Sequence, residues 1–321
     1  MTRLIRVYLP QVDPERRYEW LYRGCPHGSA LTWLASDDDS GKVIGMTSFF
    51  LRRLWVDGTE RLGALGGDGF VLPEARGHGI GTSMHRSSRA MLADQGVDVM
   101  FGTPSDLNRG PLDRSGASDV TAVGRYSRPL KLAVGPLAGI PGIHRLSWVL
   151  QPRSYRDELQ PMLRNDRRVD EVWQGFISAH HGRGIATVRS AEFYTWRFLD
   201  SPSRQQLPYV ITSRDGTPIG ACALQRLGRR LIIVDLISSP ASIGRCLTAI
   251  GANSRGSNVV DLRLALGHWT TKRLWRHGYF LRDKPRMLNV MTPAGSELEQ
   301  IFRDGQRWYF TWLESDMDSL D

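Results

Sequence analysis

The first half of the chain alternates between apolar runs and turn-forming residues, in an order that predicts several strands and two helices. Apolar runs bounded by turn signals predict strands at 30–36, 43–54, 61–72 and 97–102. A charged helical segment is expected at 14–23, and apolar positions at helical spacing predict a second helix at 80–95. The strand at 61–72 contains several glycines, so we expect it to be irregular or bulged.

The second half repeats this order of hairpin, strand, helix and strand. Its pattern predicts helices at 156–164, 169–180, 191–199 and 243–254, and strands at 209–213, 218–227, 231–238 and 259–266. The recurrence favours an internal duplication. Glycine and proline cluster between the halves in a stretch with few charges. We therefore expect one domain at 1–135, a packed connector at 136–152 and a second domain at 153–321.

Six residues between the strand at 61–72 and the helix at 80–95 carry the clearest functional signal. They are Arg76, Gly77, His78, Gly79, Ile80 and Gly81. Glycines let the backbone turn tightly and approach a ligand, and the first N–H groups of a helix lack acceptors within the helix. Such a loop binds anions, and a diphosphate fits it.

Composition restricts the class of protein and of partner. With 41% hydrophobic and 23% charged residues, the chain of 321 residues is typical of a globular protein. Its net charge of +9 is compatible with a solvated Arg-rich surface or with acidic partners such as coenzyme phosphates or an acidic carrier protein. Basic residues form no block of five or six, so nucleic acid is not an expected partner.

Cysteine usage and hydropathy point to the cytoplasm. Three cysteines, far apart in the sequence, form neither a disulfide framework nor a CxxC metal motif, which fits a reducing compartment. Charged residues interrupt the first 25 positions, and no apolar run approaches the roughly 20 residues that cross a bilayer. We expect no membrane association.

Other motifs give little support for metal or nucleophile chemistry. His180 and His181 are adjacent, and adjacent side chains point apart on a helix or a strand. The run 37–39 of aspartates lacks the spacing of a calcium loop. The sequence contains no P-loop and no GxSxG motif. We therefore expect no metal site.

The Gly-rich segment, together with the strand before it and the helix after it, resembles the GCN5-related N-acetyltransferase (GNAT) family. Arg76, Gly79 and Gly81 occupy the fixed positions of that family's coenzyme signature, [QR]xxGx[GA], and the match is most specific over 60–130. The second half resembles the same fold with its signature lost, since 239–245 holds one glycine. The resemblance implies an α/β (α+β) fold of two tandem GNAT-like domains, each a mixed, mostly antiparallel sheet flanked by helices.

The resemblance also implies a coenzyme site in the first half. In the family, the fourth and fifth strands splay apart to hold the pantetheine arm, and the loop amides bind the pyrophosphate. The implied co-substrate is acetyl-CoA or another acyl-CoA. The residues that this assigns to coenzyme binding are Phe70, Val71, Leu72, Arg76, Gly77, His78, Gly79, Ile80, Gly81, Thr82 and Asn108. An amide within 70–72 is expected to polarise the thioester carbonyl.

Two residues are catalytic candidates. Asp68 lies near the position where family members often keep a carboxylate base, although it also suits a turn or bulge. The family's proton-donating tyrosine would stand at Leu112, so Tyr126 is considered as a substitute acid, or as a packing residue. His85 is expected to be a helix-surface or core histidine rather than a catalyst.

These features predict an acyl-CoA-dependent N-acyltransferase that moves an acyl group, in the first instance acetyl, to an amine by direct attack. The expected acceptor is a small molecule, an amino sugar or a peptide. The aromatic and acidic run 308–318 either lines the acceptor site or forms the last strand and a solvated tail. One alternative is transfer of longer acyl chains from CoA or an acyl carrier protein. The other is a non-catalytic GNAT-like binding or regulatory protein.

Overall fold

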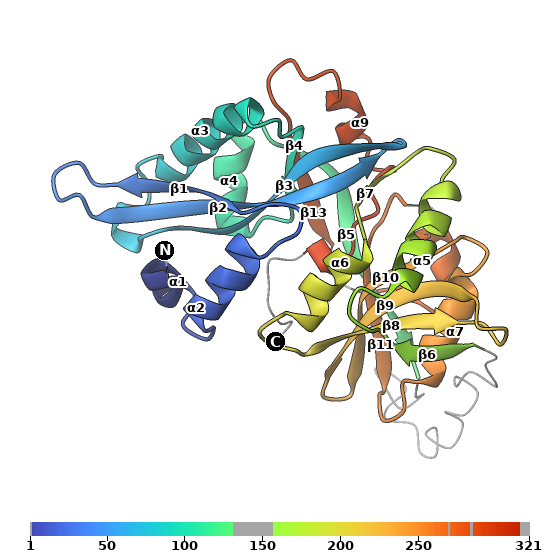
Figure 1. Ribbon diagram of the computed structural model, residues 1–321. Helices are drawn as coiled ribbons and strands as arrows, with labels where there is room; N and C mark the ends of the chain where they lie inside the picture. Colours follow the sequence, from blue (N-terminus) through green and yellow to red (C-terminus); the bar gives the residue numbers. More distant parts are fainter. Residues whose placement is uncertain (1, 131–156, 269, 283–284, 315–321) are drawn as a thin grey trace.

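A single mixed sheet runs through the molecule and joins its two halves (Figure 1). The computed structural model describes residues 2–130, 157–268, 270–282 and 285–314, so the expected connector at 136–152 lies outside the described residues. The strands follow the order β1-β2-β3-β4-β13-β5-β11-β10-β9-β8-β6, with β12 paired to β5 and β7 paired to β2. Most neighbouring pairs are antiparallel, which confirms the expected fold class.

The elements of the first half are α1 (Thr2–Tyr8), α2 (Pro14–Arg17), the π-helical turn η1 (Tyr18–Arg23), β1 (Leu31–Ser36), β2 (Val43–Val56), β3 (Thr59–Val71), η2 (Pro73–Ala75), α3 (Ile80–Asp94), β4 (Val99–Gly102), α4 (Asp106–Asp113) and β5 (Ser118–Pro129). The hairpin, the third strand and the helix after the Gly-rich loop therefore form where the sequence predicts them. In Figure 1, α3 and α4 lie on one side of the β1–β3 sheet, and α1 and α2 lie on the other.

The elements of the second half are β6 (Glu158–Pro161), α5 (Arg167–Ser178), β7 (Ile185–Thr187), α6 (Ala191–Tyr194), η5 (Thr195–Leu199), β8 (Gln206–Thr212), β9 (Pro218–Leu227), β10 (Arg230–Ser238), α7 (Ile243–Ala252), β11 (Val259–Ala265), α8 (Thr271–Leu274), η6 (Trp275–His277), β12 (Phe280–Leu281), β13 (Arg286–Met291), α9 (Glu299–Arg303) and η7 (Trp312–Glu314). The expected helix at 156–164 is wrong, because β6 is an edge strand paired with β8. Pro161 is tolerated at the end of such a strand.

Each half of the sheet is completed by a strand from the other half. β13, near the end of the chain, lies between β4 and β5 and pairs antiparallel with both. β5 in turn continues past this contact, and its second part pairs with β11 and β12. Figure 1 shows β13 beside β4 and β5 in the middle of the molecule. The sheets of the two halves are therefore continuous.

The two halves repeat one arrangement around a central contact. Trp20 of η1 donates from Nε1 to the carbonyl oxygen of Trp196 at 2.8 Å, and Trp196 of η5 donates to that of Trp20 at 2.9 Å. Each half also has an aspartate beside a bulge on its central strand, Asp68 on β3 and Asp235 on β10. Each aspartate accepts hydrogen bonds from an arginine and a tyrosine. This repetition supports the duplication hypothesis.

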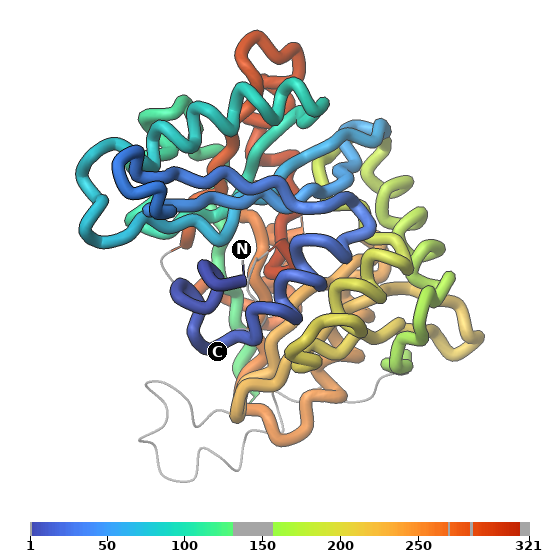
Figure 2. The backbone as a smooth tube through the Cα atoms, turned by 60° about the vertical axis from the view of Figure 1, so that its left-hand side comes forward, coloured from blue at the N-terminus to red at the C-terminus, as the bar shows by residue number. Residues whose placement is uncertain are grey.

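The hydrophobic core extends across both halves. A large cluster joins Leu65 and Phe101 of the first half to Trp196, Leu236 and Phe310 of the second. A smaller cluster packs α3 against the other face of the first-half sheet. Figure 2 shows the helical segments of the two halves packed closely along the centre of the molecule. In the described part of the chain, no helix is long and apolar enough to cross a membrane.

A histidine pair, with His268 buried and His180 partly buried, makes the fold sensitive to acid. His180 Nε2 lies 3.3 Å from His268 Nε2, and His180 Nδ1 donates to the carbonyl oxygen of Phe176 at 2.7 Å. Burial lowers the pKa of both histidines, and the nearby His180 and Arg189 lower that of His268 further. The unfolded chain therefore binds more protons than the folded chain at mildly acidic pH.

We expect the contribution of this pair to the free energy of unfolding to be highest above pH 6.5 and to fall as the pH drops below that value. The slope is up to about 1.4 kcal/mol per pH unit for each histidine. Urea unfolding between pH 5 and 7.5 measures it. Replacement of His268 by Asn should reduce this slope, whereas replacement of the exposed His78, which lies in the Gly-rich loop, by Asn is the control and should not. Equal slopes in the two variants would contradict the assignment.

Candidate active site

The site opens where β3 and β4 part. The two strands pair in parallel only from Gly63 and Val99 to Leu65 and Phe101. Beyond this point β3 continues along β2 as far as Val71, while β4 ends one residue after Phe101. The gap between the diverging strands corresponds to the splay that the family resemblance implies.

The Gly-rich loop presents the start of α3 to this gap. Gly77 and Gly79 have φ values of +86° and +79°, a left-handed conformation that disfavours other residues. Gly79 is the N-cap of α3, and the first hydrogen bond of the helix runs from the N–H of Ser83 to the carbonyl oxygen of Gly79 at 3.0 Å. The N–H groups of 80–82 consequently have no acceptor within the helix.

A cavity of about 540 Å³, here named the loop cavity, lies against these N–H groups. Arg76 and Arg114 line it, and the described part of the chain contributes no Asp or Glu to its lining. Arg76 Nε donates to the carbonyl oxygen of Val71 at 3.0 Å, and Arg114 Nε donates to Thr82 Oγ1 at 3.4 Å, so both guanidinium groups are held beside the loop. Helix N–H groups and two cations together favour a phosphate-bearing ligand.

A second cavity of about 270 Å³, here named the strand cavity, continues into the gap between β3 and β4. Its walls combine apolar side chains from the sheet with polar groups from β3, α4 and β13. The residues that line both cavities, here named the junction, are Tyr8, Thr47, Gly69, His85, Ser105 and Asn108. A long ligand anchored at the loop can therefore reach the strand cavity through the junction.

Most residues that the sequence assigned to coenzyme binding lie together in the loop cavity. Its lining includes Phe70, Val71, Arg76, Gly77, Gly79, Ile80, Gly81, Thr82 and Asn108. Leu72 and His78 are not part of the lining. The N–H of Leu72 donates to the carbonyl oxygen of Ile44 at 2.8 Å, and His78 Nδ1 lies 3.4 Å from the carbonyl oxygen of Ala75.

Asp68 lines the strand cavity, but its carboxylate is engaged. Arg17 Nη2 donates to Oδ1 at 2.6 Å and Arg17 Nε donates to Oδ2 at 3.2 Å. The hydroxyl of Tyr22 donates to Oδ2 at 2.6 Å. The pKa of Tyr22 is raised, chiefly by burial and then by the Asp68 charge. Asp68 adopts a φ of +45° within the β3 bulge. Asp68 is a bulge residue, as the sequence suggested. Its role as a catalytic base is compatible with its position in the strand cavity and stays a prediction.

Tyr126 is not brought together with the other candidates. It lies on the part of β5 that pairs with β11 and β12, is 9% exposed, and lines neither cavity. Burial raises the pKa of its hydroxyl. Leu112 does line the strand cavity, so the position of the family's tyrosine is occupied here by an apolar side chain. The structure gives no support to a catalytic role for Tyr126.

The structure adds site residues that the sequence did not indicate. Tyr8 of α1 stacks on Phe70 with ring centroids 4.9 Å apart and reaches the junction. His85 Nε2 lies 2.9 Å from Asn108 Oδ1, and burial lowers the pKa of this histidine. His85 therefore orients the Asn108 amide at the junction. Only the helical position of His85, one turn after Gly81, could have indicated this.

The second half contributes one wall of the strand cavity. Arg286, Asn289 and Met291 of β13 line it, as does Glu314 of η7. Residues 308–314 of the aromatic run are largely buried and do not form a solvated tail. The rest of the run, 315–318, lies outside the described residues. This contribution depends on the exchange of β13 between the halves, which no local pattern predicts.

The equivalent gap in the second half is filled by its own chain. β10 and β11 pair only as far as Ile233 and Leu262. Beyond that point, the N–H of Ala265 donates to the carbonyl oxygen of Phe310 at 3.1 Å, and Thr311 Oγ1 donates to Asp235 at 2.7 Å. Buried residues 308–311 therefore occupy the space between the two strands.

The start of α7 is closed as well. A Cβ on Gly244 would meet the ring of His277 at 2.5 Å, so the helix start packs directly on η6. At the equivalent place in the first half, a Cβ on Gly81 would meet Pro111 at 3.4 Å beside the open loop cavity. The geometry agrees with the expectation that the second half has lost the coenzyme site.

Comparison with solved structures identifies the fold. A GCN5-related N-acetyltransferase from Anabaena variabilis matches 91% of this chain and 69% of its own, with a TM-score of 0.66 and 14% identity. The match with a tandem GNAT protein from the clavulanic acid biosynthesis pathway covers 92% of this chain and 94% of that protein, with a TM-score of 0.56 and 14% identity. The match with Saccharomyces cerevisiae N-myristoyltransferase, solved with myristoyl-CoA, covers 87% of this chain and 71% of that protein, with a TM-score of 0.56 and 10% identity.

No family model matches the sequence, and neither does any curated protein. The similarity is therefore one of fold. The chain has the fold of the GCN5-related N-acetyltransferases in a tandem arrangement.

Proposed function

We propose that the protein is an acyl-CoA-dependent N-acyltransferase, with acetyl-CoA as the first donor to test. The observation that carries this proposal is the pair of joined cavities, one at a cationic Gly-rich helix start and the other between the parting strands. Solved structures of the same fold include N-acetyltransferases and an N-myristoyltransferase with bound myristoyl-CoA. Cytoplasmic location, and an acyl carrier protein as an alternative donor, belong to the proposal as predictions.

The coenzyme's charged end would bind at the loop. The N–H groups of 80–82 and the guanidinium groups of Arg76 and Arg114 would hold the diphosphate. The pantetheine arm would then run through the junction, where Asn108 can donate or accept a hydrogen bond without changing its charge. This path delivers the thioester to the strand cavity.

Backbone alternation selects the amide that would polarise the thioester carbonyl. Successive residues of a strand direct their N–H and C=O groups to opposite edges. The N–H of Leu72 faces β2, because it donates to Ile44, so the N–H of Val71 faces the gap. The carbonyl oxygen of Val71 accepts from Arg76, which agrees with this orientation. Among the amides at 70–72, we therefore assign the role to Val71.

The reaction would be direct transfer. The neutral nitrogen of the acceptor attacks the thioester carbon, a C–N bond forms, and the C–S bond breaks with its electron pair leaving on sulfur. The nitrogen loses one proton and the thiolate gains one. Three side chains of the junction carry a hydroxyl group that could protonate the thiolate, namely Tyr8, Thr47 and Ser105.

One observation favours the longer-chain alternative. The strand cavity, at about 270 Å³, has room for roughly nine water-sized groups at about 30 Å³ each, more than an acetyl group needs. Its apolar lining includes Phe49, Leu65, Met100 and Met291. This space is shared by the acyl group and the acceptor, so donor and acceptor lengths must be tested together.

A donor-by-acceptor panel tests the proposal. Acetyl-, octanoyl- and myristoyl-CoA are each incubated with an amino acid, an amino sugar and a short peptide, and products are identified by mass spectrometry. The proposal expects an amide product and one equivalent of free coenzyme thiol for at least one pair. Absence of coenzyme binding at millimolar concentration would favour the non-catalytic alternative.

Coenzyme stoichiometry gives a separate prediction. Because residues 308–311 fill the gap of the second half, calorimetric titration with acetyl-CoA should give one site per chain. Replacement of Gly79 by Val should weaken this single site, leaving no tighter site behind. A second, independent site that survives in this variant would contradict the account of the second half.

A further inference from the structure

The strand cavity contains two carboxylates, and they differ in how their charge is balanced. Asp68 and Glu314 are the acidic residues among those that line it. A direct-transfer reaction needs an acceptor for the proton that the amine loses. The environment of each carboxylate decides which one suits that role.

Asp68 is paired with Arg17. Its carboxylate contacts the Arg17 guanidinium, and both groups are almost fully buried. Tyr22 adds a third strong donor. Three donors, two from Arg17 and one from Tyr22, therefore hold the Asp68 carboxylate in place.

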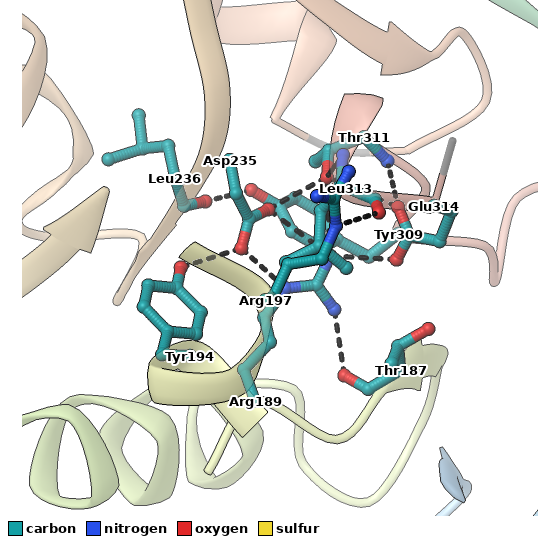
Figure 3. A network of polar contacts seen from close by, with 10 residues as sticks. All are labelled: Thr187, Arg189, Tyr194, Arg197, Asp235, Leu236, Tyr309, Thr311, Leu313 and Glu314. Carbon is teal, nitrogen blue, oxygen red and sulfur yellow. Dashed lines mark hydrogen bonds and ion pairs between the residues drawn. The ribbon is translucent and has the colours of Figure 1, made fainter. Parts of the chain in front are cut away.

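Glu314 shares its cation with a second carboxylate. Arg189 donates to Asp235 from Nε at 2.8 Å and to Glu314 Oε1 from Nη2 at 2.9 Å, and all three side chains are buried (Figure 3). The remaining Arg189 nitrogen, Nη1, donates to the carbonyl oxygen of Thr187 at 2.7 Å. One guanidinium is therefore shared by two buried carboxylates, so Glu314 does not have a cation of its own.

Other donors and one further arginine lie around these two carboxylates. Thr311 donates to Oε2 from its backbone N–H at 2.8 Å. The single hydroxyl proton of Thr311 is shared between Asp235, at 2.7 Å from Oγ1, and Glu314 Oε2, at 3.2 Å. Tyr194 donates to Asp235 at 2.6 Å, and Tyr309 donates to the carbonyl oxygen of Leu236. Arg197 is the second buried cation in Figure 3, and its Nε donates to the carbonyl oxygen of Leu313 at 3.4 Å.

Among the residues that the structure describes, no donor occupies one acceptor position of Glu314. A carboxylate has about four lone-pair positions, and Arg189 occupies one on Oε1 while Thr311 occupies two on Oε2. Burial, followed by the charge of Asp235, raises the pKa of Glu314 despite the opposing effect of Arg189. Both observations suit a group that accepts a proton during the reaction.

We propose that Glu314, supplied by the second half, is the proton acceptor of the transfer reaction, and that Asp68 is a positioning residue of the β3 bulge. The inference rests on the proposed N-acyltransferase function. As the C–N bond forms and the C–S bond breaks, the nitrogen's proton passes to Glu314 Oε1. The thiolate takes a proton from a junction hydroxyl or water, and Glu314 returns its proton to solvent.

Replacement of Glu314 by Gln tests the proposal. We expect kcat to fall about 100-fold, which is the lower range for loss of a general base, with KM for acyl-CoA within about twofold. The fall of kcat towards low pH, which reports protonation of Glu314, should disappear. A merely structural residue would change the unfolding midpoint but would leave the pH profile of the remaining activity unchanged.

Thr311→Val is the second variant, because Glu314→Gln places an amide against Arg189 and could impair folding. Loss of the Thr311 hydroxyl removes one donor to the charged carboxylate, so the acid limb of kcat should move to higher pH. The proposal is overturned if folded Glu314→Gln keeps both kcat and the acid limb. It is also overturned if the limb is unmoved in Thr311→Val.

The failure of this inference is distinguishable from failure of the function. If the unmodified protein forms no amide with any donor and acceptor, the N-acyltransferase proposal fails. If it forms amide and the Glu314 variants behave like the parent, only the assignment of the proton acceptor fails. Binding of acyl-CoA measured by calorimetry should be unchanged in Glu314→Gln in either case.

Discussion

Replacement of Gly79 by valine should raise the Kd for acetyl-CoA at least about 100-fold, equivalent to about 2.8 kcal/mol of binding free energy. Gly79 caps α3 with a φ of +79°, where a β-branched residue is strained. Its side chain would meet no protein atom within 4 Å, so it would project into the open space that the coenzyme phosphates need. Isothermal titration calorimetry measures the effect.

Gly216→Val is the matched control for this variant. Gly216 has a φ of +83° in the turn between β8 and β9, and a Cβ there also meets nothing within 4 Å. The two variants therefore carry similar backbone strain, but only Gly79 lines the loop cavity. Similar losses of affinity in both would mean that strain, and not the loop, is responsible. Unchanged affinity in Gly79→Val would contradict the proposed binding site.

Replacement of Arg189 by methionine should lower the free energy of unfolding by about 3–5 kcal/mol. The variant removes the cation shared by Asp235 and Glu314 and leaves two carboxylates buried without it. The segments that Arg189 connects, β10 and the chain after β13, also lose this link (Figure 3). Urea unfolding, followed by circular dichroism, measures the change.

Arg53→Met provides the comparison for this second prediction. Arg53 also makes a bidentate pair, with Glu60 at 2.9 and 2.6 Å, but both side chains are about half exposed. Exposed pairs contribute about 0–1 kcal/mol. A loss in Arg189→Met no greater than that in Arg53→Met would show that the buried network stabilises the fold no more than an exposed ion pair does.

The anion-binding part of the site was predictable from the sequence because its chemistry is local. Arg76, Gly79 and Gly81 lie within six residues, and a strand before them and a helix after them fix how the loop is presented. The bulge in β3 was predictable for the same reason, since glycines crowd around Asp68. Local backbone rules were sufficient in both cases.

The rest of the site depends on contacts between distant segments. Whether Asp68 is available depends on Arg17, 51 residues away, and no pattern in the sequence connects them. Tyr126 lies in a strand of the correct half but on its far part, which belongs to the neighbouring strands of the second half. Glu314 reaches the strand cavity only because β13 and the segment after it complete the first half's sheet.

A crystal structure of the protein with acetyl-CoA tests the central claim most directly. The account predicts one coenzyme per chain, with its diphosphate on the N–H groups of 80–82, its thioester carbonyl on the Val71 N–H and its acyl group directed into the strand cavity. Coenzyme bound between β10 and β11, or a diphosphate held elsewhere than at the start of α3, would contradict it.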